Sequence, residues 1–303
     1  MNQAIQIKNL VKTYATGTKA LKGVDLQVEK GDFFALLGAN GAGKTTIISI
    51  LTGLTNKTSG QARIFNHDLD TAMNAAKLEV GLVPQEFNFN IFETVLEIVV
   101  TQAGYYGVPR AEGLIRAEKI LKDLSLWEKR HDVARTLSGG MKRRLMIARS
   151  LMHHPKLLFL DEPTAGVDVE LRYGMWEYLS NLNKQGVTIF LTTHYLEEAE
   201  QLCRNVAIIK DGLIVKQGTT KALLSSLEKQ TYVLNVRKVS VQTTTISKYG
   251  LRVIDETTIE ADLNTEDNLT TFIGELAQMD IIVKDIRPKG NRLEQLFLDV
   301  LKA

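Results

Sequence analysis

The chain has 303 residues, of which 44% are hydrophobic and 24% charged, and its formal net charge at pH 7 is +2. This length fits one large domain or two ordinary ones, and the composition is typical of a globular protein. The weak net charge excludes a general attraction to nucleic acid, and the single cysteine, Cys203, excludes an internal disulfide and fits a reducing compartment. No apolar stretch approaches the roughly 18–20 residues that cross a bilayer, and the N-terminus is too polar for a secretory signal. We therefore expect a protein that is soluble by itself.

The first motif lies between a predicted buried strand, residues 32–37, and a predicted apolar helix, residues 47–54. Between them the sequence GANGAGKTT contains the pattern G-x-x-x-x-G-K-T, in which the glycines allow backbone N–H groups to surround a phosphate chain. Lys44 is expected to reach the β- and γ-phosphates, and Thr45 offers a hydroxyl to Mg²⁺. A glycine-rich turn with a solvated lysine is the alternative, which the flanking strand and helix disfavour. The predicted nucleotide-binding residues are Gly38, Ala39, Asn40, Gly41, Ala42, Gly43, Lys44, Thr45 and Thr46.

A second candidate anion site follows a hundred residues later, at LSGGM, residues 137–141. A Ser-Gly-Gly turn that opens a helix can hold a phosphate, because free backbone N–H groups and the positive helix end both face the anion. The helix predicted before this turn, after Pro109, has Leu114, Ala117, Ile120, Leu121 and Leu124 on one packing face. The presence of two phosphate sites in one chain requires an explanation.

Two carboxylates follow the predicted buried strand at residues 157–160. Ligands of open α/β sheets bind at the carboxyl ends of strands, so Asp161 and Glu162 should lie near the phosphates. Because adjacent residues point different ways, Asp161 can face Mg²⁺ while Glu162 faces the attacking water as general base. The alternative is a solvated acidic pair before a turn.

A further buried strand, residues 187–191, leads to His194, which could reach the γ-phosphate from the same edge. The other histidines have no partner spacing.

After about residue 220 the composition changes. Alternating patterns predict strands over 231–237 and 258–263, followed by a helix near 266–279, a strand over 281–286 and an amphipathic helix over 291–303. We expect a small α+β appendix with balanced charge and no basic surface for nucleic acid, serving in dimer contact or regulation.

Six motifs in a fixed order give the sequence a family resemblance. They are the phosphate loop at 38–45, Gln85 in LVPQEF, the LSGGM turn, LLFLDEP at 157–163, AGVD at 165–168, and His194. Because these six motifs occur in this order, the chain resembles the ATP-binding subunits of ATP-binding cassette (ABC) transporters over roughly residues 5–220. At position 141 the family usually has glutamine, and the methionine of this chain resembles the sequences of the ABC-2 type exporters. At position 39 the family commonly has proline, and this chain has Ala39.

The resemblance implies an α/β P-loop NTPase fold: a mostly parallel sheet, an antiparallel β subdomain and a helical subdomain at about 86–140. It implies an ATPase domain over 1–220 and an accessory domain over 221–303. It also implies that two copies pack head to tail, so that Ser138, Gly139 and Gly140 of one copy hold the γ-phosphate bound by the other. Asp168 matches an acid that crosses this interface.

Three further roles come from the resemblance. Tyr14 matches the aromatic residue that stacks on adenine, although an ordinary half-buried loop aromatic is the alternative. Gln85 matches a catalytic-site glutamine that senses Mg²⁺ and the γ-phosphate, which gives Thr45, Gln85 and Asp161 as the expected metal contacts. Phe87, Phe89 and Phe92 follow it, in a segment that in the family lines a groove for a permease helix. One or two of them are candidate exposed anchors.

The function implied is ATP hydrolysis that drives a separate integral membrane permease of the ABC-2 type, with ATP and Mg²⁺ as cofactors. The chain would form a homodimer and lie in the cytoplasm, on the inner face of the membrane. The alternative is a soluble ABC ATPase of translation or DNA repair, but such proteins carry two cassettes, long coiled coils or zinc sites. A nucleotide-binding regulator without turnover is disfavoured by the presence of Glu162.

Overall fold

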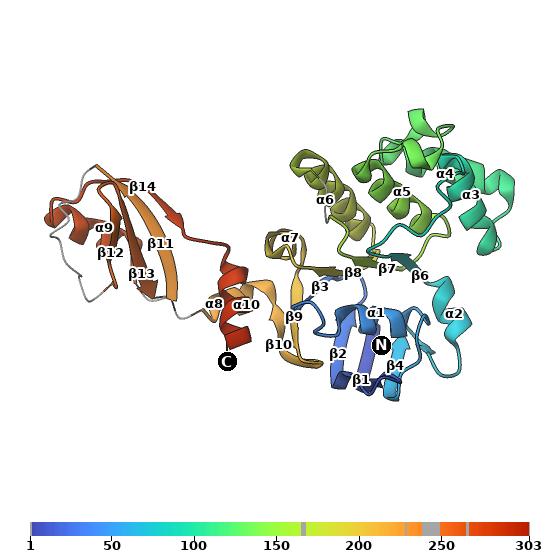
Figure 1. Cartoon of the computed structure of the whole chain (residues 1–303), viewed down its shortest axis with the longest axis horizontal. Coiled ribbons are helices and arrows are strands. Elements are labelled where there is room, and N and C mark those ends of the chain that lie inside the picture. Colours follow the sequence, from blue (N-terminus) through green and yellow to red (C-terminus); the bar gives the residue numbers. More distant parts are fainter. Residues whose placement is uncertain (1, 165–167, 228, 238–248, 265–266, 303) are drawn as a thin grey trace. The chain divides into compact units, whose positions relative to one another are not determined.

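The structure is a computed structural model that describes residues 2–164, 168–227, 229–237, 249–264 and 267–302 (Figure 1). The chain divides into two compact units, Met1–Gly218 and Thr219–Ala303, and each unit has a hydrophobic core of its own. Across the described ranges, no helix combines the length and the apolar character that a membrane span requires.

The first unit is built around a six-stranded sheet with strand order β10-β9-β3-β8-β7-β6. Its strands are β3 (Phe33–Leu37), β6 (Val80–Val83), β7 (Leu157–Asp161), β8 (Thr188–Thr193), β9 (Asn205–Lys210) and β10 (Leu213–Thr219). β3 pairs in parallel with β8 and β9, and β7 pairs in parallel with β6 and β8. Every residue of β3, β7 and β8 is buried, which explains the apolar runs in these strands. The polar residues Asp161, Thr192 and Thr193 stand at the ends of β7 and β8. The expected mostly parallel sheet is confirmed.

A row of aromatic rings crosses the three central strands and fixes their register. Phe190 of β8 pairs with Phe34 of β3 and Phe159 of β7, with ring centroids 5.6 and 5.4 Å apart. Such ring pairs contribute about 0.5–1.5 kcal/mol beyond the area that they bury. The same register places Asp161 beside Thr192, so the strands end together at one edge of the sheet.

A four-stranded antiparallel sheet of order β2-β1-β4-β5 forms a second layer of this unit. It consists of β1 (Gln3–Thr13), β2 (Lys19–Glu29), β4 (Ser59–Ile64) and β5 (His67–Asp68). The helix α1 (Lys44–Leu51) lies in the core shared by the two sheets, where Ile47 and Ile48 are buried. The antiparallel subdomain implied by the resemblance is confirmed.

Helices form the remaining part of the first unit (Figure 1). They are α2 (Met73–Leu78), α3 (Val95–Tyr105), α4 (Arg110–Asp123), α5 (Gly139–Leu151), α6 (Val169–Lys184) and α7 (Leu196–Leu202), with short 3₁₀ turns at Trp127–Lys129 and Ala134–Thr136. α3, α4 and α5 pack on one another as the helical subdomain, and α3 starts at a capping box made by Thr94 and Glu97. The packing face predicted for α4 is wrong at Leu114, which is exposed. Gly113 is buried instead, opposite Ala103, and lets the helices approach closely.

The second unit is a four-stranded antiparallel sheet of order β12-β13-β11-β14, accompanied by helices. Its elements are α8 (Thr220–Ser225), β11 (Lys229–Val236), β12 (Arg252–Asp255), β13 (Thr258–Asn264), α9 (Leu269–Gln278), β14 (Val283–Pro288) and α10 (Arg292–Lys302). Phe272 of α9 is fully buried in its core and lies 4.7 Å from the ring of Tyr249. The α+β class expected for this region is confirmed, with β12 as a strand that the sequence pattern did not predict.

Candidate active site

The loop between β3 and α1 owes its shape to two glycines. A Cβ at Gly38 would lie 2.6 Å from the carbonyl oxygen of Ile209, and a Cβ at Gly43 would lie 2.8 Å from a methyl group of Leu21. Gly43 also has a φ of +114° and directly precedes α1, a conformation that residues with a side chain rarely adopt. The loop therefore passes close to Ile209 of β9, and its residues and the first residues of α1 line one cavity.

This cavity has a volume of about 310 Å³, and the residues that line it come from the phosphate loop and from two other segments. They are Asn40, Gly41, Gly43, Lys44, Thr45, Thr46, Gln85 and Glu162. Six of the predicted loop residues thus meet Gln85 and Glu162 around one hollow, although Glu162 is more than a hundred residues from the loop in the chain. Gly38, Ala39 and Ala42 do not line it.

Lys44 lies on the floor of this cavity and is buried. Its ammonium group donates hydrogen bonds to the carbonyl oxygens of Gly38, at 2.7 Å, and Ala39, at 3.1 Å. Burial lowers the pKa of Lys44, and the nearby carboxylates of Glu162 and Asp161 oppose that shift. A polyanion in the cavity would add negative charge to that of these carboxylates and could accept hydrogen bonds from the ammonium group, which now donates to two neutral carbonyls.

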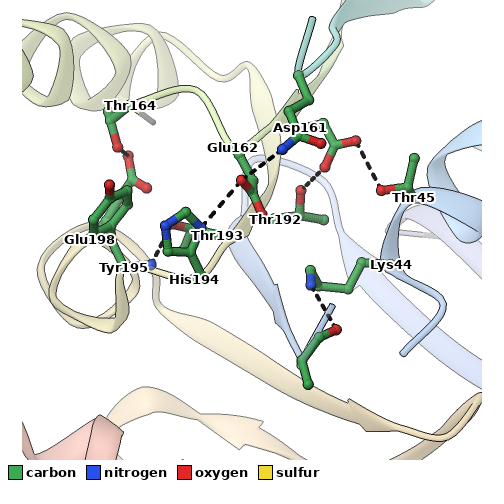
Figure 2. A network of polar contacts seen from close by, with 12 residues as sticks. Lys44, Thr45, Asp161, Glu162, Thr164, Thr192, Thr193, His194, Tyr195 and Glu198 are labelled. Carbon is green, nitrogen blue, oxygen red and sulfur yellow. Dashed lines mark hydrogen bonds and ion pairs between the residues drawn. The ribbon is translucent and has the colours of Figure 1, made fainter. Parts of the chain in front are cut away.

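Asp161 and Thr45 meet at the end of β7 (Figure 2). The hydroxyl of Thr45 donates to Asp161 Oδ2 at 3.2 Å, and the hydroxyl of Thr192 donates to Asp161 Oδ1. A carboxylate and a hydroxyl are oxygen donors of the kind that Mg²⁺ prefers. In the part of the chain that the structure describes, no group of three or more His, Cys, Asp or Glu side chains could hold a metal ion. The oxygen atoms of Thr45 and Asp161 therefore fit a Mg²⁺ by the chemistry of the donors.

Glu162 is the next residue, and its side chain turns to a different set of partners (Figure 2). Its carboxylate oxygen Oε2 accepts a hydrogen bond from Gln85 Nε2 at 3.1 Å and lies 3.2 Å from His194 Nδ1. The backbone of Glu162 has a φ of +51°, the left-handed region, and its N–H donates to the carbonyl oxygen of Thr192 at 2.9 Å. This bend separates the two acids, so that Asp161 faces Thr45 while Glu162 faces the cavity.

Tyr14 lies beside the phosphate loop. Its hydroxyl is 3.3 Å from the hydroxyl of Thr46, and the ammonium group of Lys12 lies 4.8 Å from its ring centroid. The ring is partly exposed, with 38% of the residue's surface accessible. An exposed aromatic face next to a phosphate loop can stack on a base, so the placement fits the predicted adenine contact.

The Ser-Gly-Gly turn is found elsewhere. Ser138 caps α5, and its side-chain oxygen accepts a hydrogen bond from the N–H of Met141 at 3.3 Å. Ser138 and Gly139 are exposed, Gly140 is buried, and a Cβ at Gly139 would contact nothing within 4 Å. None of the three lines the cavity around Lys44.

Asp168 is exposed at the start of α6, and its carbonyl oxygen accepts from the N–H of Arg172. It does not line the cavity either. The rest of the AGVD motif, residues 165–167, lies outside the described residues.

Sequence reasoning missed two residues that hold this site. Thr192 anchors both acids, and its position at the end of a buried strand beside Asp161 is a signal that could have been used. Arg143 of α5 is buried and donates to the carbonyl oxygens of Pro84, at 3.0 Å, and Gln85, at 2.9 Å. A charged residue in an amphipathic helix carries no pattern that predicts such a backbone contact.

The assembled geometry has the parts needed for phosphoryl chemistry. It combines a backbone cradle, a buried cation, an oxygen site for Mg²⁺ and a carboxylate that faces the cavity. The carboxylate of Glu162 is held by an amide and an imidazole, so it can accept a proton from water without losing its orientation.

Comparison with known proteins gives the same picture. The family model described as ABC transporter matches residues 21–165. The linearmycin resistance ATP-binding protein of Bacillus subtilis is 34% identical over 98% of this chain and 97% of its own length. The Nod factor export ATP-binding protein I of Cupriavidus metallidurans is 38% identical over 75% of this chain and 74% of its own.

Solved structures agree with this result. A dimeric ATP-binding cassette in a post-hydrolysis state, bound to ADP and phosphate, superposes with a TM-score of 0.67 and 28% identity. The match covers 71% of this chain and 98% of that one.

Proposed function

Because this chain belongs to the family of ATP-binding subunits of ABC transporters, we propose that it hydrolyses Mg-ATP between two copies of itself and thereby drives a separate membrane permease. ATP hydrolysis coupled to transport is the activity of the family.

The residues around the cavity divide the work between binding and catalysis. The phosphate loop, with Lys44, would bind the phosphates, and Tyr14 would stack on adenine. Thr45, Gln85 and Asp161 would hold Mg²⁺, which when bound neutralises charge on the phosphate oxygens. Glu162 would take the proton of the attacking water, while His194 holds Glu162 and contacts the γ-phosphate. The single observation that carries this proposal is the convergence of Lys44, Gln85 and Glu162 on one cavity.

A second copy would complete the site. Ser138 and Gly139 are exposed and Gly140 is buried at the start of α5, where the first backbone N–H groups of a helix have no partner within the helix. The three residues are absent from the lining of the chain's own cavity, so an anion held by this turn would belong to another subunit. Asp168, also exposed, is the proposed partner contact across the same interface.

The proposed partner is an integral permease of the ABC-2 type, which would hold the chain in the cytoplasm at the inner face of the membrane. Two relatives are named for linearmycin resistance and for Nod factor export, which favours an exporter. Phe87 and Phe92 are exposed directly after Gln85, and Phe89 is half-buried. The rings of Phe87 and Phe89 lie 6.1 Å apart, and exposed aromatic residues in one short segment favour a docking surface for a permease helix.

Glu162→Gln tests the proposal directly. Gln keeps the size and the hydrogen-bonding reach of the side chain but cannot take a proton, so turnover should fall by about 10²–10⁴-fold while ATP binding stays. ATP should then trap a dimer, which size-exclusion chromatography with light scattering measures. Glu128→Gln, on the 3₁₀ turn Trp127–Lys129 of the helical subdomain, is the matched control. Normal turnover in Glu162→Gln would contradict the role of the base, and a monomer with ATP would contradict the dimer.

A further inference from the structure

A buried carboxylate outside the cavity joins the two segments that carry Glu162 and His194. Glu198 lies on α7 and is completely buried. Its oxygen Oε1 accepts a hydrogen bond from the hydroxyl of Thr164 at 3.1 Å and a second one from the indole N–H of Trp176 at 3.0 Å. Figure 2 shows Glu198 against Thr164, away from the cavity. One side chain thus contacts residues from two other parts of the fold.

The positions of Thr164 and Trp176 in the chain show which segments Glu198 connects. Thr164 is the second residue after Glu162, and Trp176 belongs to α6. On the other side, Glu198 itself belongs to α7, which begins at Leu196, the second residue after His194. Glu198 therefore connects the segment that follows Glu162 with the segment that begins at His194.

The His194 side is fixed by a second set of contacts. The N–H of Tyr195 donates to the hydroxyl of Thr193 at 2.9 Å, and the ring of Tyr195 lies 4.1 Å from the ring of His194. The guanidinium of Arg172 lies 4.7 Å from the Tyr195 ring centroid, and its positive charge also acts on Glu198. The histidine is thus part of a packed group that includes the buried carboxylate.

Keeping an acid at this position is costly. Burial raises the pKa of Glu198, and the hydrogen bonds from Thr193, Trp176 and Thr164 oppose the rise only in part. A buried acid gives no general gain in stability over an apolar side chain of similar size, but it fixes the geometry of its donors. Its benefit should therefore be sought in the placement of Glu162 and His194.

We propose that Glu198 is a positioning residue for ATP hydrolysis: its carboxylate ties the segment behind Glu162 to the segment that carries His194 and so holds this pair 3.2 Å apart. It contacts neither the cavity nor the residues that line it, so its effect acts through these two residues. The inference rests on the proposed roles of Glu162 and His194. It predicts a loss in kcat with little change in KM for ATP.

The test compares Glu198→Ala with Glu198→Gln in the purified chain. Alanine removes the acceptor, and we expect kcat to fall about tenfold or more, because small misplacements of reacting groups cost up to about 10²-fold. Glutamine keeps a carbonyl oxygen for both Thr164 and Trp176, so it should restore kcat to within about threefold of the wild type. KM and the binding of a fluorescent ATP analogue should change by less than about threefold in both variants.

Asp32→Ala is the matched control. Asp32 is also a buried acid of the first unit, and burial raises its pKa. Its carboxylate accepts a hydrogen bond from Asn205 at 2.8 Å, which opposes that rise. It lies directly before β3, at the opposite edge of the sheet from the cavity. Its loss should lower the melting temperature without lowering kcat. If Glu198→Ala and Asp32→Ala lower kcat by the same factor, or if kcat of Glu198→Ala stays within about twofold of the wild type, the proposal is overturned.

A double-mutant cycle separates this inference from the proposed function. In the His194→Ala background Glu198→Ala should have little further effect on kcat, because the residue it positions is gone. Additive losses would overturn the inference. Glu162→Gln and His194→Ala are measured alongside. If these two keep normal kcat, the proposed function itself fails, whereas if only the Glu198 variants are normal, the inference alone fails. Trp176→Phe removes one donor and keeps the test valid should Glu198→Ala not fold, with an expected loss in kcat of about threefold.

Discussion

The two units of this chain hold their buried acids in opposite ways. In the second unit Glu260 of β13 is buried, but Lys289 lies 2.7 Å away and Arg252 3.6 Å away, so its charge is met by cations of the same domain. In the first unit Asp161 and Glu162 accept hydrogen bonds from hydroxyl, amide and imidazole groups and, within the described ranges, form no ion pair with Lys or Arg. Asp161 and Glu162 act electrostatically on the buried Lys44 and Arg143 without a direct ion pair to either, so they can also attract a cation that enters the cavity.

Topology explains why this difference falls where it does. Parallel strands end at a common edge, so the polar residues after β7 and β8 meet there, next to the phosphate loop after β3. In the antiparallel second unit, Glu260 lies within a strand and pairs across the sheet surface. The parallel sheet therefore brings polar side chains of several strands together at one end, whereas in the antiparallel sheet the buried acid is paired with nearby cations.

The largest effect should come from Lys44→Ala, which removes the one cation at the floor of the cavity. Charge-assisted hydrogen bonds contribute about 1.5–3 kcal/mol, so ATP affinity should fall by roughly 10- to 150-fold and hydrolysis should become undetectable. Equilibrium binding of a fluorescent ATP analogue measures the loss. Lys122→Ala, an exposed lysine of α4 paired with Glu118, is the control. Unchanged ATP affinity in Lys44→Ala would show that this cavity does not bind the phosphates of ATP.

Ser138→Arg should abolish turnover while leaving ATP affinity in the wild-type range, because the serine belongs to the turn proposed to complete another subunit's site. Steady-state hydrolysis and light scattering with ATP measure both halves of this expectation. Asn268→Arg is the control, because Asn268 is also an N-cap, at the start of α9. Loss of either cap should lower the free energy of unfolding by ~1 kcal/mol, but Asn268→Arg should not affect turnover. Hydrolysis by a Ser138→Arg monomer would refute the trans role.

A moderate effect is expected at Tyr14. Base stacking contributes about 1–3 kcal/mol, so Tyr14→Ala should weaken ATP binding by roughly 5- to 150-fold, and Tyr14→Phe should bind nearly as the wild type does. Titration with ATP and with inorganic triphosphate makes the test specific, since only ATP binding should depend on the ring. Equal losses for both ligands would mean that Tyr14 supports the loop through Thr46 instead.

The smallest effect on hydrolysis should come from Glu260→Gln in the second unit. It removes the charge that meets Lys289 and Arg252, so we expect a loss of about 1 kcal/mol and a melting temperature of this unit lower by about 4–8 °C. The kcat for ATP should not change. Lys289→Gln should lower stability by a similar amount, and the double variant should show non-additivity. A fall in kcat in Glu260→Gln would show that the two units are not independent in catalysis.

The sequence predicted the elements of the site better than their contacts. The phosphate loop and the strands before Asp161 and His194 could be predicted, because each motif has a local pattern and a parallel strand is apolar throughout. The contacts of Arg143 with the backbone of Gln85, and of Glu198 with Thr164 and Trp176, arise only when distant segments pack. No periodicity of the sequence contains that information.

The same limit appears in the rest of the fold. The packing face of α4 was misjudged at Leu114 because a glycine, Gly113, takes the buried position, and hydrophobicity alone favours the larger side chain. β12, with the short sequence Arg252–Asp255, was missed because it is an edge strand with little apolar content. Both errors come from tertiary context that outweighs local preference.

The left-handed backbone of Glu162 has an evolutionary consequence. Valine, isoleucine or threonine at this position would meet a steric penalty before any question of chemistry arose, whereas asparagine, aspartate and glycine would be tolerated by the main chain. Glutamine would have the same backbone strain as glutamate, so relatives that have lost turnover should drift toward asparagine, aspartate or glycine and keep the bend. The left-handed backbone conformation would then persist in relatives that no longer hydrolyse ATP.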